Sequence, residues 1–377
     1  MRVLIVGAGI AGLSLGIALR RIGADAELVD VTEDTEGASI GLTGRAVDVL
    51  AELGVLDACA AAGRVLGPGR SVFDEMRDEY GNRLVIPGPP GPPRPPAPPT
   101  GLPSAITIYR PELARILRAA ADDAGASRRV GPTVEALRQD ADGVDVTFTD
   151  GTTGRYDLVV GADGVRSTVR RLIHGEEIQP IYTGHMSLRW ILRDGPDGEP
   201  GFYTRTGGMV AIAPLPGGVT YLATGLDMPN ERVDPATARQ LLRDALAPYP
   251  APYLQALRDA VTEDQVVLAR PFEWLLVPEP WHRGRVTVIG DAAHATTALL
   301  SSGGGMALED AAVLAQELAA ASTPEKALDA FMTRRLDRVR TVVEVSVQLL
   351  EMQTSNADQR AIGAARGRAL GLLAQPY

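Results

Sequence analysis

The sequence predicts an α/β fold: a Rossmann-like nucleotide-binding unit with an inserted, mostly antiparallel sheet and C-terminal helices. Three observations predict it. A buried strand, a glycine-rich turn and a helix occupy residues 3–22 and lead into a second strand at 26–30. Two later buried strands, at 156–160 and 285–290, are each followed or ended by glycine and aspartate. Between them, residues 178–270 form short segments rich in Thr, Tyr, Val and Gly, which are typical of antiparallel strands.

Composition limits the possible functions of the 377 residues. With 45% hydrophobic and 22% charged residues the chain is typical of soluble globular proteins, and its net charge of −10 argues against nucleic-acid binding. The single Cys59 excludes a disulfide framework and a multi-cysteine metal site, and the four histidines lack a paired metal-binding spacing. No apolar run is long enough to span a membrane and no signal peptide is evident. We therefore expect a cytoplasmic protein with no metal, membrane or nucleic-acid partner.

The remaining elements follow from apolar periodicity along the chain. It predicts helices at 44–62 and 111–124, the second opened by Arg110-Pro111 because proline is favoured in a first helical turn. A strand is predicted at 144–149, and helices are predicted at 235–259, 305–321 and 326–353. The proline-rich stretch 86–103 fits neither a helix nor a central strand, so we expect an extended surface loop.

These elements divide the chain into two interleaved domains and a tail. The nucleotide-binding domain is predicted to comprise residues 1–72, 103–177 and 270–325. The inserted domain is predicted to comprise residues 73–102 and 178–269, and residues 326–377 form a C-terminal helical segment. The proline-rich loop would then lie beside the inserted domain, where it could border the entrance of a pocket.

The first glycine turn has the spacing of a dinucleotide-binding fingerprint. Gly7, Gly9 and Gly12 follow a strand and open a helix, and Asp30 ends the next strand. The first glycine permits the turn, the second lets the backbone approach a pyrophosphate, and the third packs the helix against the strand. Asp30 is placed to accept hydrogen bonds from ribose hydroxyls. An overlapping hydrolase pattern, GxSxG, fails because Ser14 lies inside the helix and not at the strand-to-helix turn.

Two more acidic residues follow later strands. Asp163 lies in GADGVR and Asp291 in GDAAH, each just after a buried strand. Because parallel strands end at one edge of a sheet, where ligands bind in open α/β folds, these carboxylates are predicted to accept ribityl or ribose hydroxyls. Residues 301–305 (SSGGG) precede a helix, and their backbone N–H groups would favour negative charge at the helix start.

In this order the motifs resemble those of the FAD-dependent aromatic hydroxylases, the single-component flavoprotein monooxygenases. ITIYRPELARILRAA and TGRAVDVLAELGV resemble the segments in which that family carries arginines near the cofactor, and WHRGRVTVIGDAAH is close to the family's usual wording. The resemblance covers nearly the whole chain. It implies an FAD site formed by Gly7, Gly9, Ala11, Gly12, Asp30, Arg45, Arg110, Asp163, Arg166, Asp291, Ser302, Gly303, Gly304 and Met306.

The resemblance also implies an activity. In that family NAD(P)H binds transiently and reduces FAD, and the reduced flavin adds O2 to give a C4a-hydroperoxide. The distal oxygen then passes to a phenol or another electron-rich ring, with the cofactor supplying the chemistry and the protein the geometry. The implied partners are O2 and a small aromatic or polyketide-like substrate, with the chain acting as a monomer or homodimer.

Four residues of the inserted sheet are candidates for contact with the substrate: His185, Arg189, Tyr203 and Tyr221. His185 could assist phenol deprotonation, because imidazole exchanges protons near neutral pH. Strand alternation places His185 and Arg189 on one face and Trp190 on the other. The alternatives are packing for the tyrosines and an internal carboxylate partner for Arg189.

One loop departs from the family's pattern. The usual T-P-x-x-G-Q-G motif, which passes the reacting edge of the flavin, is replaced by TALLSSG at residues 297–303. This change leaves open a flavin-binding accessory role without turnover. Epoxidation or oxidative rearrangement of an alkene or polyketide on the same fold also stays open. A nicotinamide dehydrogenase is suggested by the glycine motif alone, but the two later aspartate motifs count against it. The W-x-W-x-I-P segment of flavin halogenases is not found.

Overall fold

The computed structural model describes residues 1–33, 37–68, 70, 72–84, 101–355 and 357–377, and it confirms the α/β class. The nucleotide-binding unit is built on a six-stranded sheet in the order β17-β18-β11-β1-β2-β7. Five of its strands are parallel and β17 is an antiparallel edge strand. The strands are β1 (Arg2–Val6), β2 (Asp25–Asp30), β7 (Ser127–Val130), β11 (Leu158–Gly161), β17 (His282–Arg283) and β18 (Val286–Val288).

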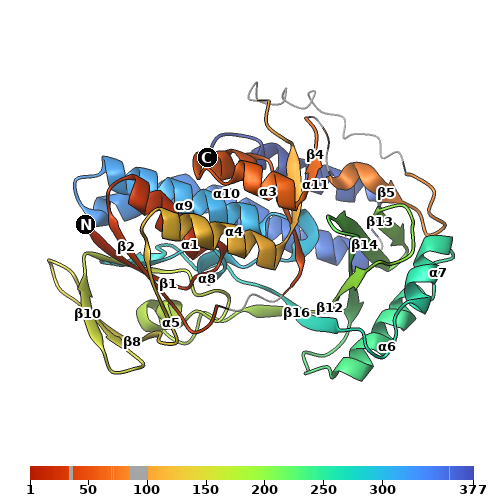
Figure 1. Cartoon of the computed structure of the whole chain (residues 1–377), viewed down its shortest axis with the longest axis horizontal. Coiled ribbons are helices and arrows are strands. Elements are labelled where there is room, and N and C mark those ends of the chain that lie inside the picture. Colours follow the sequence, from red (N-terminus) through yellow and green to blue (C-terminus); the bar gives the residue numbers. More distant parts are fainter. Residues whose placement is uncertain (34–36, 69, 71, 85–100, 356) are drawn as a thin grey trace.

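Long helices pack on this sheet (Figure 1). Helix α1 (Ile10–Arg21) follows the glycine turn and contacts both α4 (Arg110–Asp123) and α9 (Gly303–Ala320). Its leucines and isoleucines are almost fully buried, so the helix sits in the core of the unit. Two short helices, α5 (Thr168–His174) and α8 (Asp291–His294), follow β11 and β18. The chain ends in α10 (Pro324–Thr354) and α11 (Gln359–Leu373), which pack against each other.

Two predicted helices are each broken in two, so those predictions were wrong in length. The stretch 44–62 is α2 (Arg45–Glu52) followed by α3 (Leu56–Ala62), because Gly54 adopts a positive φ of 67° between them. The stretch 235–259 is α6 (Pro235–Leu246) followed by α7 (Pro252–Asp259). Pro248, the first proline after α6, cannot donate the helical hydrogen bond, and Pro252 starts the second helix.

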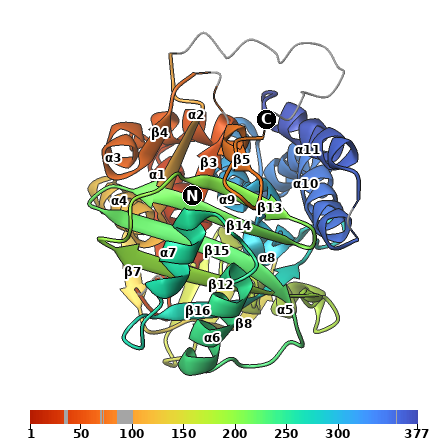
Figure 2. The same cartoon turned by 90° about the vertical axis from the view of Figure 1, so that its right-hand side faces the viewer.

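A second six-stranded sheet has the order β16-β12-β15-β14-β13-β5 and is antiparallel except for its β13–β5 pair. It contains β5 (Met76–Arg77), β12 (Ile181–Arg193), β13 (Gly201–Arg205), β14 (Gly208–Leu215), β15 (Val219–Asp227) and β16 (Val267–Trp274). Helices α6 and α7 cover one of its faces (Figure 2). Leu188, Trp190 and Leu222 pack there against Leu242 and Leu254 in a separate hydrophobic core. The opposite face of this sheet is not covered by α6 and α7 and faces other parts of the molecule.

Two three-stranded antiparallel sheets complete the fold. One joins β3 (Ser39–Thr43), β6 (Ala105–Tyr109) and β4 (Arg64–Leu66), and the other joins β10 (Thr153–Tyr156), β9 (Val144–Phe148) and β8 (Val134–Gln139). Single 3-10 turns are η1 (Val72–Glu75) and η2 (Ala298–Leu300).

Two sequence predictions about organisation are left open. Most of the predicted proline-rich loop, residues 86–100, lies outside the described residues. The predicted domain division stays a prediction, and β16 runs across its boundary at residues 269 and 270. Within the described ranges, every helix is too short or too polar to cross a membrane.

Candidate functional site

One cavity of about 880 Å³ is lined by both six-stranded sheets and by the loop that leads into α9. At one end it is bounded by the β1–α1 glycine turn and at the other by β12, β14 and β15. Most of the predicted site residues line it, although they come from widely separated segments. These are Gly7, Gly9, Ala11, Asp30, Arg110, Asp163, Arg166, His185, Arg189, Tyr221, Asp291, Ser302, Gly303 and Gly304.

The glycine turn has the geometry that its spacing predicts. Gly7 has a φ of 106°, and a Cβ on Gly12 would lie 1.9 Å from the carbonyl oxygen of Gly7. A Cβ on Gly9 would meet nothing within 4 Å, so this glycine faces open space at the N-terminus of α1. The Asp30 carboxylate accepts a 2.6 Å hydrogen bond from the Ala8 N–H, which fixes the turn. The open volume is a cradle for a phosphate group at a helix N-terminus.

Three buried polar atoms at the cavity have no hydrogen-bond partner among the described residues, and two of them lie outside the second six-stranded sheet. One is Nε of Arg110, at the start of α4, and the other is Oγ1 of Thr296, in the loop before α9. Buried polar atoms are rarely left unpaired in native proteins. Together with the open cradle at Gly9, they fit a large polar cofactor such as FAD.

The two later aspartates differ in what they offer the cavity. Asp163 caps α5, since its carboxylate accepts hydrogen bonds from Thr168 N–H at 2.7 Å and Val169 N–H at 3.1 Å. Burial raises the pKa of Asp163, and these hydrogen bonds oppose that effect. Its carboxylate is thus engaged within the protein, whereas the carboxylate of the exposed Asp291 has no hydrogen-bond or ion-pair partner among the described residues. We therefore favour Asp291 over Asp163 as the acceptor for cofactor hydroxyls.

The altered loop ends at the N-terminus of α9. Ser301 has a positive φ of 50°, and Ser302 Oγ donates a 2.8 Å hydrogen bond to Leu300 O. The helix begins at Gly303, two residues before its predicted start. Gly303 and Gly304 both line the cavity, so the positive end of the α9 dipole faces it.

Four predicted site residues do not line the cavity. Gly12 acts in packing, and Arg45 bonds Asp48 at 2.8 Å and Ala374 O at 3.2 Å. Met306 is buried in the first turn of α9. Tyr203 is buried in the core beneath α6 and α7, and its hydroxyl donates to Glu199 O at 2.7 Å. The structure therefore does not bring Tyr203 to the other substrate-side candidates.

His185 lies at the cavity, and each of its ring nitrogens lies close to an oxygen atom. It is paired in register with Asp227, and its Nε2 lies 2.8 Å from Asp227 Oδ1. Its Nδ1 lies 3.1 Å from Thr183 O. The Nε2 contact lacks hydrogen-bond geometry, so only Nδ1 is hydrogen-bonded among the described residues, and a role of His185 in substrate deprotonation stays a prediction. As strand alternation predicts, Trp190 lies on the opposite face.

Arg189 and Tyr221 leave polar groups facing the cavity. Arg189 Nε donates to Ser187 Oγ at 3.2 Å, and within the described ranges no carboxylate lies within ion-pair distance of its guanidinium. Desolvation raises the pKa of Tyr221, while the positive charge of Arg189 partly opposes this. Tyr221 therefore keeps its proton at neutral pH and can act as a hydrogen-bond donor.

Sequence reasoning missed two sets of residues. Leu350, Gln353 and Thr354 at the end of α10 line the cavity, and Phe272 of β16 lines it too. Gln353 Nε2 lies 3.7 Å from Met209 Sδ, a weak acceptor. Nothing in the sequence links the end of α10 to β14, because that contact depends on the tertiary packing.

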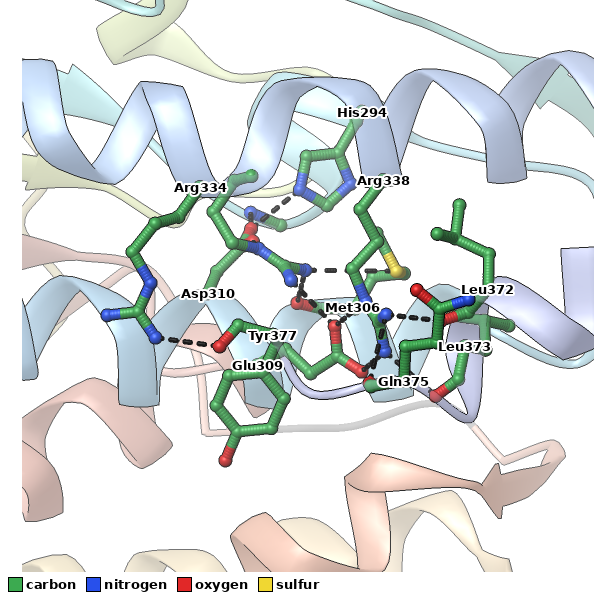
Figure 3. Close-up of polar contacts among 12 residues, drawn as sticks. His294, Met306, Glu309, Asp310, Arg334, Arg338, Leu372, Leu373, Gln375 and Tyr377 are labelled. Atoms are coloured by element: carbon green, nitrogen blue, oxygen red, sulfur yellow. Dashed lines mark hydrogen bonds and ion pairs between the residues drawn. The ribbon is translucent and has the colours of Figure 1, made fainter. Parts of the chain in front are cut away.

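The second set is a buried network behind the cavity (Figure 3). Asp310 of α9 accepts hydrogen bonds from Gly290 N–H at 2.9 Å and Arg335 Nε at 2.8 Å, and it lies 2.6 Å from His294 Nε2. Glu309 bonds Arg335 at 2.6 Å and Arg338 at 2.7 Å. The network ties the loop after β18 to α9. The sequence carried one signal for this network. Two adjacent acidic residues lie in an otherwise apolar helix, and arginines three or four residues apart lie in the next helix.

The comparisons with known proteins agree with this geometry. A family model described as an FAD binding domain matches residues 1–192 and 251–346. The chain belongs to this FAD-binding family. The family member is 31% identical over 355 residues to aurachin C monooxygenase/isomerase of Stigmatella aurantiaca, covering 93% of this chain and 88% of that protein. It is 30% identical over 358 residues to an FAD-dependent urate hydroxylase of Klebsiella pneumoniae, covering 91% and 88%.

A solved structure supports the same fold. The crystal structure of Klebsiella pneumoniae HpxO complexed with FAD and uric acid aligns with a TM-score of 0.79 and 24% identity, covering 100% of this chain and 97% of that chain. The predicted relation to aromatic-hydroxylase flavoproteins and the predicted FAD cofactor are confirmed. This family member is an FAD-dependent monooxygenase.

Proposed function

We propose that this flavoprotein uses NAD(P)H and O2 to hydroxylate an aromatic or other electron-rich small molecule. One observation carries the proposal: one cavity is lined by the glycine turn, by the N-terminus of α9 and by the face of β12 and β15 that carries Arg189 and Tyr221. When bound and reduced by NAD(P)H, FAD supplies the activation of O2, of which one atom enters the substrate and the other leaves as water. The chain has one dinucleotide fingerprint, which supports transient binding of the nicotinamide.

The protein's own residues would bind, orient and shield. Gly9 and Arg110 would hold the pyrophosphate, and Asp291 would accept cofactor hydroxyls. Gly303 and Gly304 at the start of α9 would stabilise negative charge in the cavity. Tyr221 Oη would donate a hydrogen bond to a substrate oxygen, and the apolar Leu350 and Phe272 would exclude water.

Oxidative rearrangement is the second candidate. The relative from Stigmatella aurantiaca is named as both a monooxygenase and an isomerase, and this chain carries the altered loop at 297–303. Product mass and carbon connectivity separate the two reactions. A ring with one added oxygen supports hydroxylation, and an epoxide or a changed skeleton supports the alternative.

The purified protein is expected to carry one FAD per chain. Adding an aromatic substrate should then accelerate NAD(P)H and O2 consumption together and yield a product heavier by one oxygen atom. Absorbance, an oxygen electrode and mass spectrometry measure these. The proposal is wrong if the protein does not take up FAD. It is also wrong if no member of a broad panel of phenols and heteroaromatics gains oxygen, which would favour an accessory role.

Replacing the two candidate tyrosines by phenylalanine should separate their roles. Tyr221→Phe removes a donor at the cavity, so we expect kcat/KM to fall about 10-fold with little change in unfolding. Tyr203→Phe removes a buried bond to Glu199 O, so we expect a loss of about 1 kcal/mol in the free energy of unfolding and unchanged kcat/KM. Steady-state kinetics and urea unfolding measure both, and the reverse pattern would contradict these assignments.

A further inference from the structure

The substrate end of the cavity has a flat floor of small side chains. Ala211 on β14 is paired with Ala223 on β15, and Ala213 and Gly225 extend this patch in opposite directions along the two strands. Neighbouring strands lie about 4.8 Å apart, and residues two apart on a strand lie about 6.7 Å apart. The surface of small side chains is therefore longer than one six-membered ring and wide enough for two fused rings, and Met209 and Phe272 bound it at the Gly225 end.

The side chains that surround this floor favour a planar ligand. A Cβ on Gly225 would lie 3.3 Å from Cε2 of Phe272, so the Phe272 ring stands at one edge. Leu350 and Gln353 of α10 line the same cavity from another element. Together they make a slot with an apolar floor and an aromatic wall, and aromatic rings gain from stacking and edge contacts in such a slot.

A cation without an ion-pair partner lies beside the floor. Arg189 is paired in register with Ala223, and its side chain donates a hydrogen bond from Nε to Ser187 Oγ. No carboxylate within the described parts of the chain neutralises its guanidinium. A half-buried guanidinium is stabilised by an anion that accepts two parallel hydrogen bonds. The uncharged Tyr221 donor lies opposite Ala213, at the far end of the floor from Gly225.

We propose that the substrate is a planar fused-ring aromatic that bears an anionic oxygen group, with its rings on the floor of Ala211, Ala213, Ala223 and Gly225 and its anion on Arg189. The inference rests on the proposed function of this same cavity and adds the class of substrate to it. A single ring leaves part of the floor uncovered, and a neutral molecule leaves Arg189 unpaired.

Three probes and the FAD-loaded enzyme test this inference. The probes are 1-hydroxy-2-naphthoate (fused and anionic), 1-naphthol (fused and neutral) and salicylate (a single anionic ring). Titrations that follow the flavin absorbance give dissociation constants, and NAD(P)H consumption gives a second readout. We expect the fused anion to bind about 10-fold more tightly than either of the other probes.

Two variants separate charge from ring size. Arg189→Gln should remove the preference for the naphthoate over 1-naphthol, and Arg189→Lys should restore part of it. Ala223→Leu fills the floor and should remove the preference for the naphthoate over salicylate, with the charge preference kept. Arg193→Gln is the matched control, because Arg193 is an exposed arginine of the same strand that does not line the cavity.

The results that test the substrate class differ from those that test the proposed function. Equal affinities for the three probes, failure of the fused anion to bind, or an unchanged preference in Arg189→Gln would each overturn the substrate class. The proposed function stands or falls on bound FAD and on oxygenation of some other compound in the wider panel. Loss of FAD from a variant would show as a bleached flavin spectrum, and Arg189→Lys then carries the test.

Discussion

Replacing Gly9 by valine is expected to abolish FAD binding while the apoprotein keeps its fold. A side chain at Gly9 meets no protein atom within 4 Å, and its φ of −79° and ψ of −167° suit valine. The added carbons would instead occupy the space that a pyrophosphate needs at the N-terminus of α1. We expect FAD affinity to fall at least 100-fold, or about 2.7 kcal/mol, with the free energy of unfolding changed by less than about 1 kcal/mol. Flavin titration and urea unfolding of the apoprotein measure the two quantities.

Two matched variants bracket this result. Gly67→Val also adds a side chain in open space, but away from the cavity, so both quantities should stay near those of the native protein. Gly12→Val forces a Cβ to within 1.9 Å of Gly7 O, so it should impair folding as well as FAD binding. If Gly9→Val binds FAD normally, the pyrophosphate does not lie at this turn.

The nucleotide end of the site could be predicted because its signals are local. Gly7, Gly9 and Asp30 belong to one strand–turn–helix–strand unit, in which each residue type is required by the backbone path itself. Asp291 follows a buried strand in the same way. Parallel pairing then brings such strand ends to one edge of the sheet without further information.

The substrate end could not be predicted in the same detail, because it depends on register and on packing between distant elements. Tyr203 and Tyr221 both lie on strands of one sheet, yet one faces α6 and α7 and the other faces the cavity. Alternation orders residues within a strand but does not say which face is covered. To predict that Gln353 lies at the cavity, one would need to know where the long helix α10 ends relative to β14.

Replacing Arg335 by methionine should cost about 3–5 kcal/mol in the free energy of unfolding. Arg335 is fully buried and bonds Asp310 at 2.8 Å and Glu309 at 2.6 Å, so its loss leaves two buried carboxylates with fewer partners. Arg334→Met is the matched control one residue away. Its bridge to Glu317 is partly exposed, so we expect a loss of no more than about 1 kcal/mol. Urea unfolding at pH 7 measures both variants.

The pH dependence of that deficit distinguishes lost charge from lost packing. Burial alone would raise the pKa of Asp310, but His294 and Arg335 hold it below its ordinary value. In the native protein Asp310 therefore contributes stability that is complete above the ordinary carboxyl pKa of about 3.9 and is lost as pH falls through the lowered folded value. In the Arg335→Met variant one of the positive charges that lower the pKa of Asp310 is gone, so burial raises that pKa. The folded variant should therefore take up a proton on Asp310 more readily than its unfolded chain. The deficit should then be largest at pH 7 and shrink toward pH 5, whereas a deficit independent of pH would assign the effect to packing.

Because Asp310 also holds the Gly290 N–H beside the cavity, the variant should bind FAD more weakly even where it stays folded.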